Sequence, residues 1–261
     1  MKSTVPIFIV SLKKDIERRN NITNALSAQN LSWTVIDAIE GKNLQPDYLE
    51  SLNYQFSGLV TANEVACSLS HQSIYKKIIN SDIEWALIFE DDAIINEQLS
   101  GLIEQLESGK TSLLRKKNIY LLGGQEGLIS RNRISLSLIN TININNIIFR
   151  KVTYTPNKIS RTCCYLIHRE ECKKLIDLFD EYFYVADAWG LFHKFKIVNE
   201  YFLTEIVKHP IVSIENSNLE KDRIENSNRL KKSPRRKKGN IETKIAYLLL
   251  QTRRFFRSLK F

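Results

Sequence analysis

The sequence predicts an α/β protein with a mostly parallel sheet flanked by helices. Apolar, strand-like runs alternate with amphipathic, helix-like segments along most of the chain, which is typical of parallel sheets. Residues 85–89 are apolar without polar alternation, as in a strand buried on both faces. The chain has 261 residues, of which 43% are hydrophobic and 26% charged. This composition excludes a disordered or fibrous protein.

The first half of the chain contains three predicted strands and two predicted helices. In order, these are a strand at 5–12, a helix at 15–28, a strand at 33–36, a helix from 61 to about 80 and the strand at 85–89. Gly41 marks a turn before the second helix. Thr61 followed three residues later by Glu64 has the pattern of a capping box, which predicts where that helix begins.

The second half is predicted to continue the alternation. We expect helices at 98–106, 170–179 and 187–195, and strands at 119–122, 147–155, 162–167 and 201–207. The glycines Gly123 and Gly124 close the strand at 119–122. The segment 127–146 is polar and rich in Ser, Asn and Ile, and its pattern gives no assignment.

The charge of the chain is concentrated at its C-terminal end. The formal net charge is +9, but residues 229–261 hold twelve Lys or Arg and one acid, so they carry +11 and residues 1–228 carry −2. The polar, charged segment 215–238 has the composition of a linker. We therefore predict a folded domain over 1–228 and a basic tail over 229–261.

The tail has the pattern of a basic amphipathic helix. Its apolar residues fall on one helical face: Ile241, Ile245, Leu248, Leu249, Phe255, Phe256 and Leu259. Such helices lie in membrane interfaces and prefer anionic lipids. The alternatives are docking of the helix onto the body and nucleic-acid binding, for which the chain has no recognisable module. No apolar run reaches the roughly 20 residues that span a bilayer, and no secretory signal is evident. We expect a cytoplasmic protein, peripheral at the inner face of the membrane.

Three consecutive carboxylates, Glu90, Asp91 and Asp92, follow the apolar run at 85–89. Ligands bind outside the carboxyl ends of strands in open α/β sheets. Neighbouring carboxylates repel unless a positive group holds them, and a hard divalent cation is the usual partner. The pattern predicts a metal site, with an acidic turn that caps the next helix as the alternative. The four cysteines show no metal-ligand spacing and are interpreted as core residues of a reducing compartment.

Several motifs together resemble glycosyltransferase family 25, which includes bacterial lipooligosaccharide galactosyl- and glucosyltransferases and animal collagen galactosyltransferases. The matching segments are IFIVSLKKDIERR at 7–19, Asp37-Ala38 with Gly41, NEVACSLSHQSIYKKI at 63–78 and ALIFEDDAII at 86–95. The segments YLLGG, RTCCYLIHREECKKLI and VADAWG, at 120–124, 161–176 and 185–190, match more loosely. The resemblance covers about residues 5–215. The chain departs from it at Cys163-Cys164, where the family has Gly, Ser or Ala before the tyrosine.

The resemblance implies a GT-A-like, Rossmann-type fold and an inverting transfer of galactose or glucose. The implied donor is UDP-galactose or UDP-glucose, with Mn²⁺ or Mg²⁺ held by Glu90 and Asp92 in place of the family's acid-x-acid motif. The implied acceptor is a lipid-linked oligosaccharide, such as the lipooligosaccharide or lipopolysaccharide core, in a β-1,4-galactosyltransferase-like reaction. Nucleic acid is not an expected partner.

The resemblance also implies roles for single residues. Asp187 in VADAWG is the candidate general base, with a helix N-cap as its alternative role, and Glu205 is held in reserve. His209 is a further candidate metal ligand, although the family pattern does not require one. Of Arg18 and Arg19, only Arg18 is expected to face inward. The residues expected to bind the donor are Ser11, Arg18, Asp37, Glu64, His71 and Asp91.

Two other classes of function fit parts of the pattern. A metal-dependent phosphohydrolase would use the same acids but usually needs more histidines than the four present. A non-catalytic membrane-binding or nucleic-acid-binding protein would act through the basic tail alone.

Overall fold

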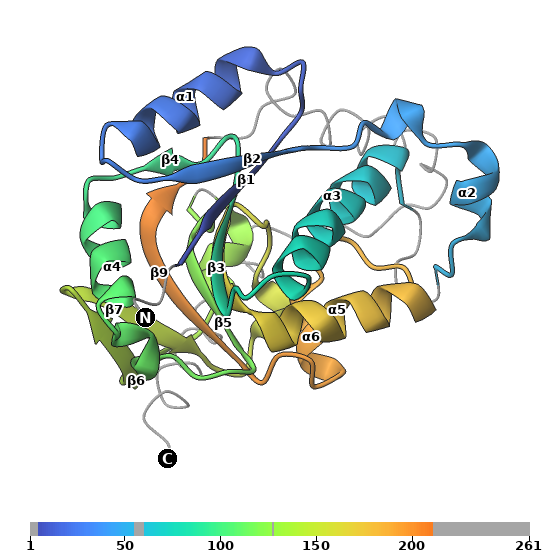
Figure 1. Ribbon diagram of the computed structural model, residues 1–261. Helices are drawn as coiled ribbons and strands as arrows, with labels where there is room; N and C mark the ends of the chain where they lie inside the picture. Colours follow the sequence, from blue (N-terminus) through green and yellow to red (C-terminus); the bar gives the residue numbers. More distant parts are fainter. Residues whose placement is uncertain (1–4, 55–59, 127, 211–261) are drawn as a thin grey trace, which may run out of the picture.

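The computed structural model describes residues 5–54, 60–126 and 128–210, which form one mixed sheet with helices on both faces (Figure 1). The sheet order is β2-β1-β3-β8-β5-β9-β7-β6, and β4 pairs with β9. The strands are β1 (Ile7–Ser11), β2 (Trp33–Asp37), β3 (Trp85–Glu90), β4 (Ile94–Ile95), β5 (Asn118–Gly123), β6 (Leu136–Ile144), β7 (Ile147–Val152), β8 (Cys164–His168) and β9 (Glu200–Lys208).

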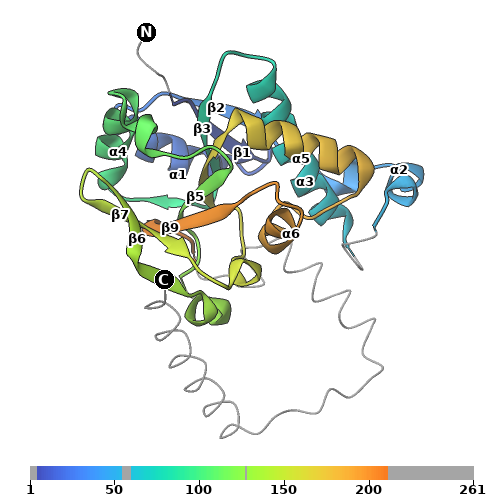
Figure 2. The ribbon, with the colours of Figure 1, turned by 90° about the horizontal axis from the view of Figure 1, so that it is seen from below.

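The helices pack on both faces of the sheet. They are α1 (Ile16–Ser27), α2 (Pro46–Ser51), α3 (Ala62–Ile79), α4 (Gln98–Glu107), α5 (Arg169–Glu181) and α6 (Trp189–Lys194). Helices α1 and α4 lie on one face, and α3, α5 and α6 lie on the other (Figure 1). Helices α3 and α5 pack side by side (Figure 2).

The helices that flank one large sheet confirm the predicted α/β class, and the strand directions make this sheet mixed. Strand β1 is parallel to both β2 and β3, and β5 is parallel to β9. Strand β8 runs antiparallel between β3 and β5, and β7 runs antiparallel beside β9. The beginning of β8 therefore lies at the same edge of the sheet as the ends of β1, β3, β5 and β9.

Two hydrophobic cores follow from the alternation of side chains along the central strands. In β1, Ile7 and Ile9 join the core under α1 and α4, whereas Phe8 joins the core under α3 and α5. In β3, Leu87 faces the first core and Ile88 the second. Because successive side chains point to opposite faces, a continuous apolar run is what a strand buried on both faces requires.

Helix α3 begins where the capping box predicts. The Thr61 hydroxyl accepts from the Glu64 backbone N–H at 3.1 Å, and the Glu64 carboxylate accepts from the Thr61 N–H at 2.9 Å. These two bonds satisfy donors that the first helical turn leaves without partners. Glu64, expected to contact the donor, thus has a structural role here.

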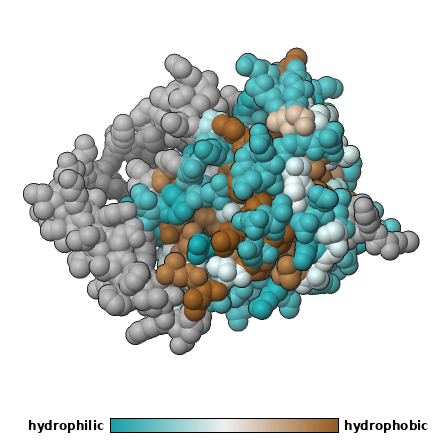
Figure 3. All heavy atoms as spheres, turned by 90° about the vertical axis from the view of Figure 1, so that its left-hand side faces the viewer, coloured by the Kyte–Doolittle hydropathy of each residue, from teal (hydrophilic) through white to brown (hydrophobic). Residues whose placement is uncertain are grey.

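The structure assigns β6 within the segment 127–146 that the pattern left open. Strands β6 and β7 form a hairpin that turns at Asn145 and Asn146, whose φ angles are +51° and +63°. Asparagine tolerates this left-handed conformation, so the Asn pair is a hairpin signal. The hairpin exposes Leu138, Ile139 and Ile148 to solvent. Figure 3 shows the side of the molecule on which it lies, where apolar residues are interspersed among hydrophilic ones.

The predicted linker at 215–238, the domain boundary at 228/229 and the basic amphipathic helix lie outside the described residues. They stay predictions. Within the described part of the chain, none of the helices combines the length and apolar character needed to cross a membrane.

Glu171 on α5 predicts a pH dependence of stability. Its side chain is fully buried, and burial raises its pKa from 4.5 to about 7, although Lys174 partly opposes the shift. The folded state therefore holds a proton that the unfolded state has lost between pH 4.5 and 7, and stability falls as the pH rises through this window. A shift of this size corresponds to as much as about 3 kcal/mol. We expect Glu171→Gln to remove this decline, as measured by urea unfolding at pH 5 and pH 8.

The neighbouring residue provides the control for that experiment. Glu170 is exposed, and its hydrogen bond with Lys116 lowers the pKa of its carboxyl group. Glu170→Gln should leave the decline in place. An equal decline in Glu171→Gln would show that Glu171 does not cause it.

Candidate active site

The predicted acids lie at one edge of the sheet, together with residues from distant parts of the chain. Ser11 and Glu90 end the parallel strands β1 and β3, and Ser11 pairs in register with Asp37 at the end of β2. Because β8 is antiparallel to β3, Thr162, just before β8, reaches the same edge. His209 follows β9 and arrives there too. The carboxyl edge of the sheet thus gathers the candidate site, as predicted.

Arg18 from α1 binds two of the three consecutive carboxylates. Its Nη2 lies 2.5 Å from Asp91 Oδ1 and 2.8 Å from Asp92 Oδ2. Burial raises the pKa of Asp91 to about 6, against the opposing effects of Arg18 and the Ser11 hydroxyl. This guanidinium is a positive group that lets the acids pack together.

Asp92, Glu90 and His209 form a group with the spacing of metal ligands. One potential ligand atom from each lies within 4.8 Å of the others. His209 Nε2 lies 3.3 Å from Asp92 Oδ2. Burial opposes charge on both groups, but their mutual attraction outweighs it, so the pKa of Asp92 is lowered and that of His209 is raised. Asp92 Oδ1 is buried and has no hydrogen-bond partner among the described residues. A buried carboxylate oxygen without a partner is costly, which makes this atom suited to a cation.

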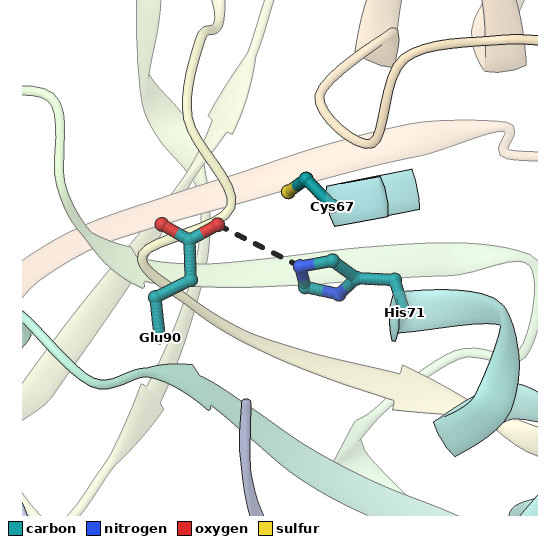
Figure 4. A group of neighbouring side chains, drawn as sticks. All are labelled: Cys67, His71 and Glu90. Carbon is teal, nitrogen blue, oxygen red and sulfur yellow. Dashed lines mark ion pairs between the residues drawn. The ribbon is translucent and has the colours of Figure 1, made fainter. Parts of the chain in front are cut away.

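Glu90 also contacts the face of α3. Its Oε1 accepts a hydrogen bond from Thr162 Oγ1. The same oxygen lies 3.6 Å from His71 Nε2 (Figure 4). His71 is buried, and its Nδ1 lies 2.8 Å from the Tyr165 hydroxyl. The structure therefore brings His71 to the acids.

Both arginines of α1 are engaged, which corrects the expectation that only Arg18 faces inward. Arg19 Nη2 donates to Asp37 Oδ1 at 2.7 Å and to the Ser11 carbonyl at 3.0 Å. Arg19 Nε also donates to Ser11 Oγ at 3.3 Å. The two side chains point to different strands. Arg18 binds the acids that follow β3, and Arg19 bridges the ends of β1 and β2. Asp37 and Ser11, both expected to bind the donor, are thus held together by Arg19.

Asp187 does not cap a helix through its side chain. Helix α6 begins at Trp189 after Ala188, and no side-chain bond caps it. Asp187 Oδ2 instead accepts from the Arg161 backbone N–H at 2.9 Å. Glu205, the reserve candidate for the general base, is paired with Arg131, which donates to its two carboxylate oxygens at 2.7 Å each.

Arg161 is a site residue that the sequence patterns did not single out. Its backbone has φ +63°, and its Nη1 donates to the Gly124 carbonyl at 2.9 Å. Burial lowers the pKa of Arg161, whereas Asp92, Glu90 and Asp187 act in the opposite direction. The guanidinium is therefore within electrostatic reach of the metal-ligand candidates and of the candidate base. The one sequence signal that points to Arg161 is its place in RTCCY, two residues before Cys163-Cys164, where the chain differs from the family pattern.

The two adjacent cysteines belong to the core rather than to the surface of the site. Cys163 and Cys164 are both buried in the core under α1 and α4. A Cβ added at Gly124 would lie 2.5 Å from Cys163 Cβ, so glycine at 124 makes room for this cysteine. A Cβ at Gly123 would likewise collide with the Val207 carbonyl oxygen, 1.6 Å away. The YLLGG segment thus allows β9 and the start of β8 to approach β5 closely.

Comparison with protein-family models decides the relationship. The model of glycosyltransferase family 25, described as LPS biosynthesis protein, matches residues 4–189. The chain belongs to glycosyltransferase family 25. The matched range contains Arg18, Arg19, the three acids, His71, Arg161 and Asp187, whereas Glu205 and His209 lie beyond it.

Curated proteins similar to this chain include named transferases and proteins named as inactive. Human procollagen galactosyltransferase 2 is 29% identical over 109 residues, covering 38% of this chain and 17% of the relative. The Haemophilus influenzae lipooligosaccharide biosynthesis protein lic2B is 26% identical over 101 residues, covering 38% of each chain. Human inactive glycosyltransferase 25 family member 3 is 31% identical over 125 residues, 44% of this chain and 21% of the relative. The chain thus spans well under half the length of these relatives.

A solved structure with a similar outline is that of a glycosyltransferase involved in glycosylation of the major capsid of PBCV-1. It is 10% identical, with a TM-score of 0.42, and the match covers 86% of this chain and 99% of that one.

Proposed function

We propose that this family 25 chain is a metal-dependent, inverting hexosyltransferase that uses UDP-galactose or UDP-glucose. The observation that carries the proposal is the group of Glu90, Asp92 and His209 at the carboxyl edge of the sheet, with Asp92 Oδ1 buried and without a hydrogen bond among the described residues. The family and the position of the group favour a nucleotide-sugar site.

The residues at this position fit a divalent metal ion. Two carboxylates and one imidazole are a donor set that Mn²⁺ accepts readily, whereas Mg²⁺ prefers oxygen ligands alone. Asp92 Oδ1 and a Glu90 carboxylate oxygen would hold the ion, with His209 Nε2 as third ligand. When bound, such an ion neutralises negative charge that grows on a departing diphosphate.

The surrounding cations support binding of the donor. Arg18 already neutralises Asp91 and Asp92, and the half-buried Arg161 adds a second guanidinium close by. Guanidinium groups bind phosphate oxygens in a fixed, planar geometry. We assign the diphosphate to this region and the uridine to Ser11 and Asp37, where Arg19 orders the strand ends.

Asp187 is proposed as the general base. It would take the proton of the acceptor hydroxyl as that oxygen bonds to the anomeric carbon, while the bond from this carbon to the diphosphate breaks and UDP leaves with the electron pair. The Arg161 N–H orients Oδ2 of Asp187, so its Oδ1 is the oxygen assigned to the acceptor. Attack from the side opposite the leaving group inverts the anomeric configuration.

The proposed acceptor is a lipid-linked oligosaccharide of the lipooligosaccharide type. The family description and the Haemophilus relative support this choice. A basic tail at 229–261 that binds an anionic membrane would bring a cytoplasmic enzyme to such an acceptor. Deletion of 229–261 should abolish sedimentation with anionic vesicles but leave UDP binding unchanged. Sedimentation that persists after the deletion would contradict the role of the tail.

A panel of nucleotide sugars tests the proposed function. The chain is heated with each UDP-sugar in the presence of Mn²⁺ or of a chelator, and slow hydrolysis of each donor is measured. We expect UDP-galactose or UDP-glucose to raise the melting temperature and to be hydrolysed only with the metal. Because some relatives are named as inactive, the absence of both effects for every sugar would overturn the proposal.

A further inference from the structure

A second group of potential metal ligands lies on the face of α3 that meets the acids. Cys67 and His71 are four residues apart on one helix, so their side chains project from the same face. One ligand atom each from Cys67, His71 and Glu90 lies within 4.8 Å of the others. Figure 4 shows the three side chains converging from α3 and from the end of β3. The sequence showed no metal-ligand pattern here because Glu90 is distant from Cys67 and His71 in the sequence, and only the fold brings it beside them.

His71 is oriented for this group. The residue is 1% exposed, and its Nε2 has no hydrogen-bond partner in the described part of the chain, although it points toward Glu90 Oε1 at 3.6 Å. That separation is too long for a hydrogen bond but suits two ligands of one ion. The other ring nitrogen, Nδ1, lies 2.8 Å from the Tyr165 hydroxyl. Metal-bound histidines usually donate their second N–H to such a partner, which fixes the ring.

The chemistry of the three groups differs from that of the neighbouring oxygen-rich site. A thiolate, an imidazole and a carboxylate are the ligands that Zn²⁺ prefers, with a fourth position left for water. Mn²⁺ and Mg²⁺ prefer oxygen ligands and have little affinity for sulfur. The thiolate therefore gives the second group a stronger preference for Zn²⁺ over Mn²⁺ than the first group has, although Glu90 belongs to both.

We propose that Cys67, His71 and Glu90 form a second cation site, which binds Zn²⁺ or another thiophilic divalent ion. Binding releases the thiol proton of Cys67 and forms the metal–sulfur bond. Occupation of this site withdraws Glu90 from the group with Asp92 and His209. Zn²⁺ therefore inhibits the enzyme, and this part of the inference rests on the proposed function.

Cobalt absorption tests the site without any donor or acceptor. The full chain is titrated with Co²⁺, whose bond to a thiolate gives a charge-transfer band in the near ultraviolet. We expect the band to saturate at one equivalent, to disappear on addition of Zn²⁺ and to be absent in Cys67→Ser. His209→Ala is the matched control: it changes the neighbouring group and should keep the band. Absence of the band in the unmodified chain, or its persistence in Cys67→Ser, would overturn the proposal.

A second measurement does not depend on the folding of a cysteine variant. Zn²⁺ should slow alkylation of Cys67 by iodoacetamide in the unmodified chain, as followed by mass spectrometry of the peptide. Tyr165→Phe should weaken Zn²⁺ binding about 10- to 100-fold and keep the cobalt band, because it removes the hydroxyl that contacts His71 Nδ1 and the Tyr75 hydroxyl but none of the three ligands. Equal alkylation rates with and without Zn²⁺ would contradict the site.

The two proposals can fail separately. Donor hydrolysis with Mn²⁺ but no thiolate–cobalt band refutes the second site alone. A thiolate–cobalt band without hydrolysis of any UDP-sugar refutes the proposed transferase alone. If both hold, added Zn²⁺ should lower the rate with Mn²⁺ in the unmodified chain, and Cys67→Ser should need a higher Zn²⁺ concentration for the same relative loss.

Discussion

Replacement of Asp92 by Asn is expected to lower sugar transfer by at least about 10²–10³-fold, the usual effect of losing one group that stabilises developing charge. The variant removes the charge of the carboxylate whose Oδ1 is assigned to the metal. Arg18 keeps its contact with Asp91 at 2.5 Å, so the end of β3 should stay in place. Protection of the protein against heat by donor and Mn²⁺ should disappear together with activity.

Asp82→Asn is the matched control for this variant. Asp82 is exposed and precedes β3 at the end of the strand opposite Asp92. Asp82→Asn makes the same change from carboxylate to amide. The variant should retain full sugar transfer and full protection against heat by donor and Mn²⁺. Unchanged metal-dependent activity in Asp92→Asn would refute the assignment of Asp92 as a ligand.

Replacement of Asp187 by Asn is expected to lower kcat by about 10²–10⁴-fold, the range for loss of a general base. The amide oxygen of Asn can still accept the Arg161 N–H that Asp187 Oδ2 accepts at 2.9 Å. The local backbone is therefore preserved, while the ability to take a proton is lost. Binding of the donor with Mn²⁺, measured by thermal protection, should remain unchanged.

The separation of binding from catalysis distinguishes a base from a structural residue. If Asp187 only orders the segment around Arg161, Asp187→Asn should be nearly as active as the unmodified chain. Asp177→Asn, an exposed carboxylate on α5, is the control for general effects of the charge change. Loss of donor binding together with kcat would assign Asp187 to the donor rather than to the acceptor.

Most of the fold could be predicted from periodicity because its central strands are buried on both faces. Residues 85–89 gave the core of β3, and the capping box gave the start of α3. Strand β6 was left unassigned because it is at the edge of the sheet and its exposed positions break the apolar pattern. The two-residue strand β4 and the six-residue helix α2 are too short to produce a periodic signal.

The site could be predicted only where its residues are local in the chain. The consecutive acids and the motif with His71 were visible as segments, and the structure places them together. The bond from Thr162 to Glu90 and the position of Arg161 depend on β8 running antiparallel beside β3. Sequence spacing carries no information on that pairing. His209 reaches Asp92 for a similar reason, since β9 ends at the same edge.

The most direct measurement is the location of a manganese ion in crystals grown with UDP, by anomalous X-ray scattering at the manganese edge. We predict one strong peak within bonding distance of Asp92 and Glu90 carboxylate oxygens and of a diphosphate oxygen, with His209 as third protein ligand. UDP bound with its diphosphate away from these carboxylates, and no anomalous peak beside Asp92, would contradict the metal-dependent mechanism.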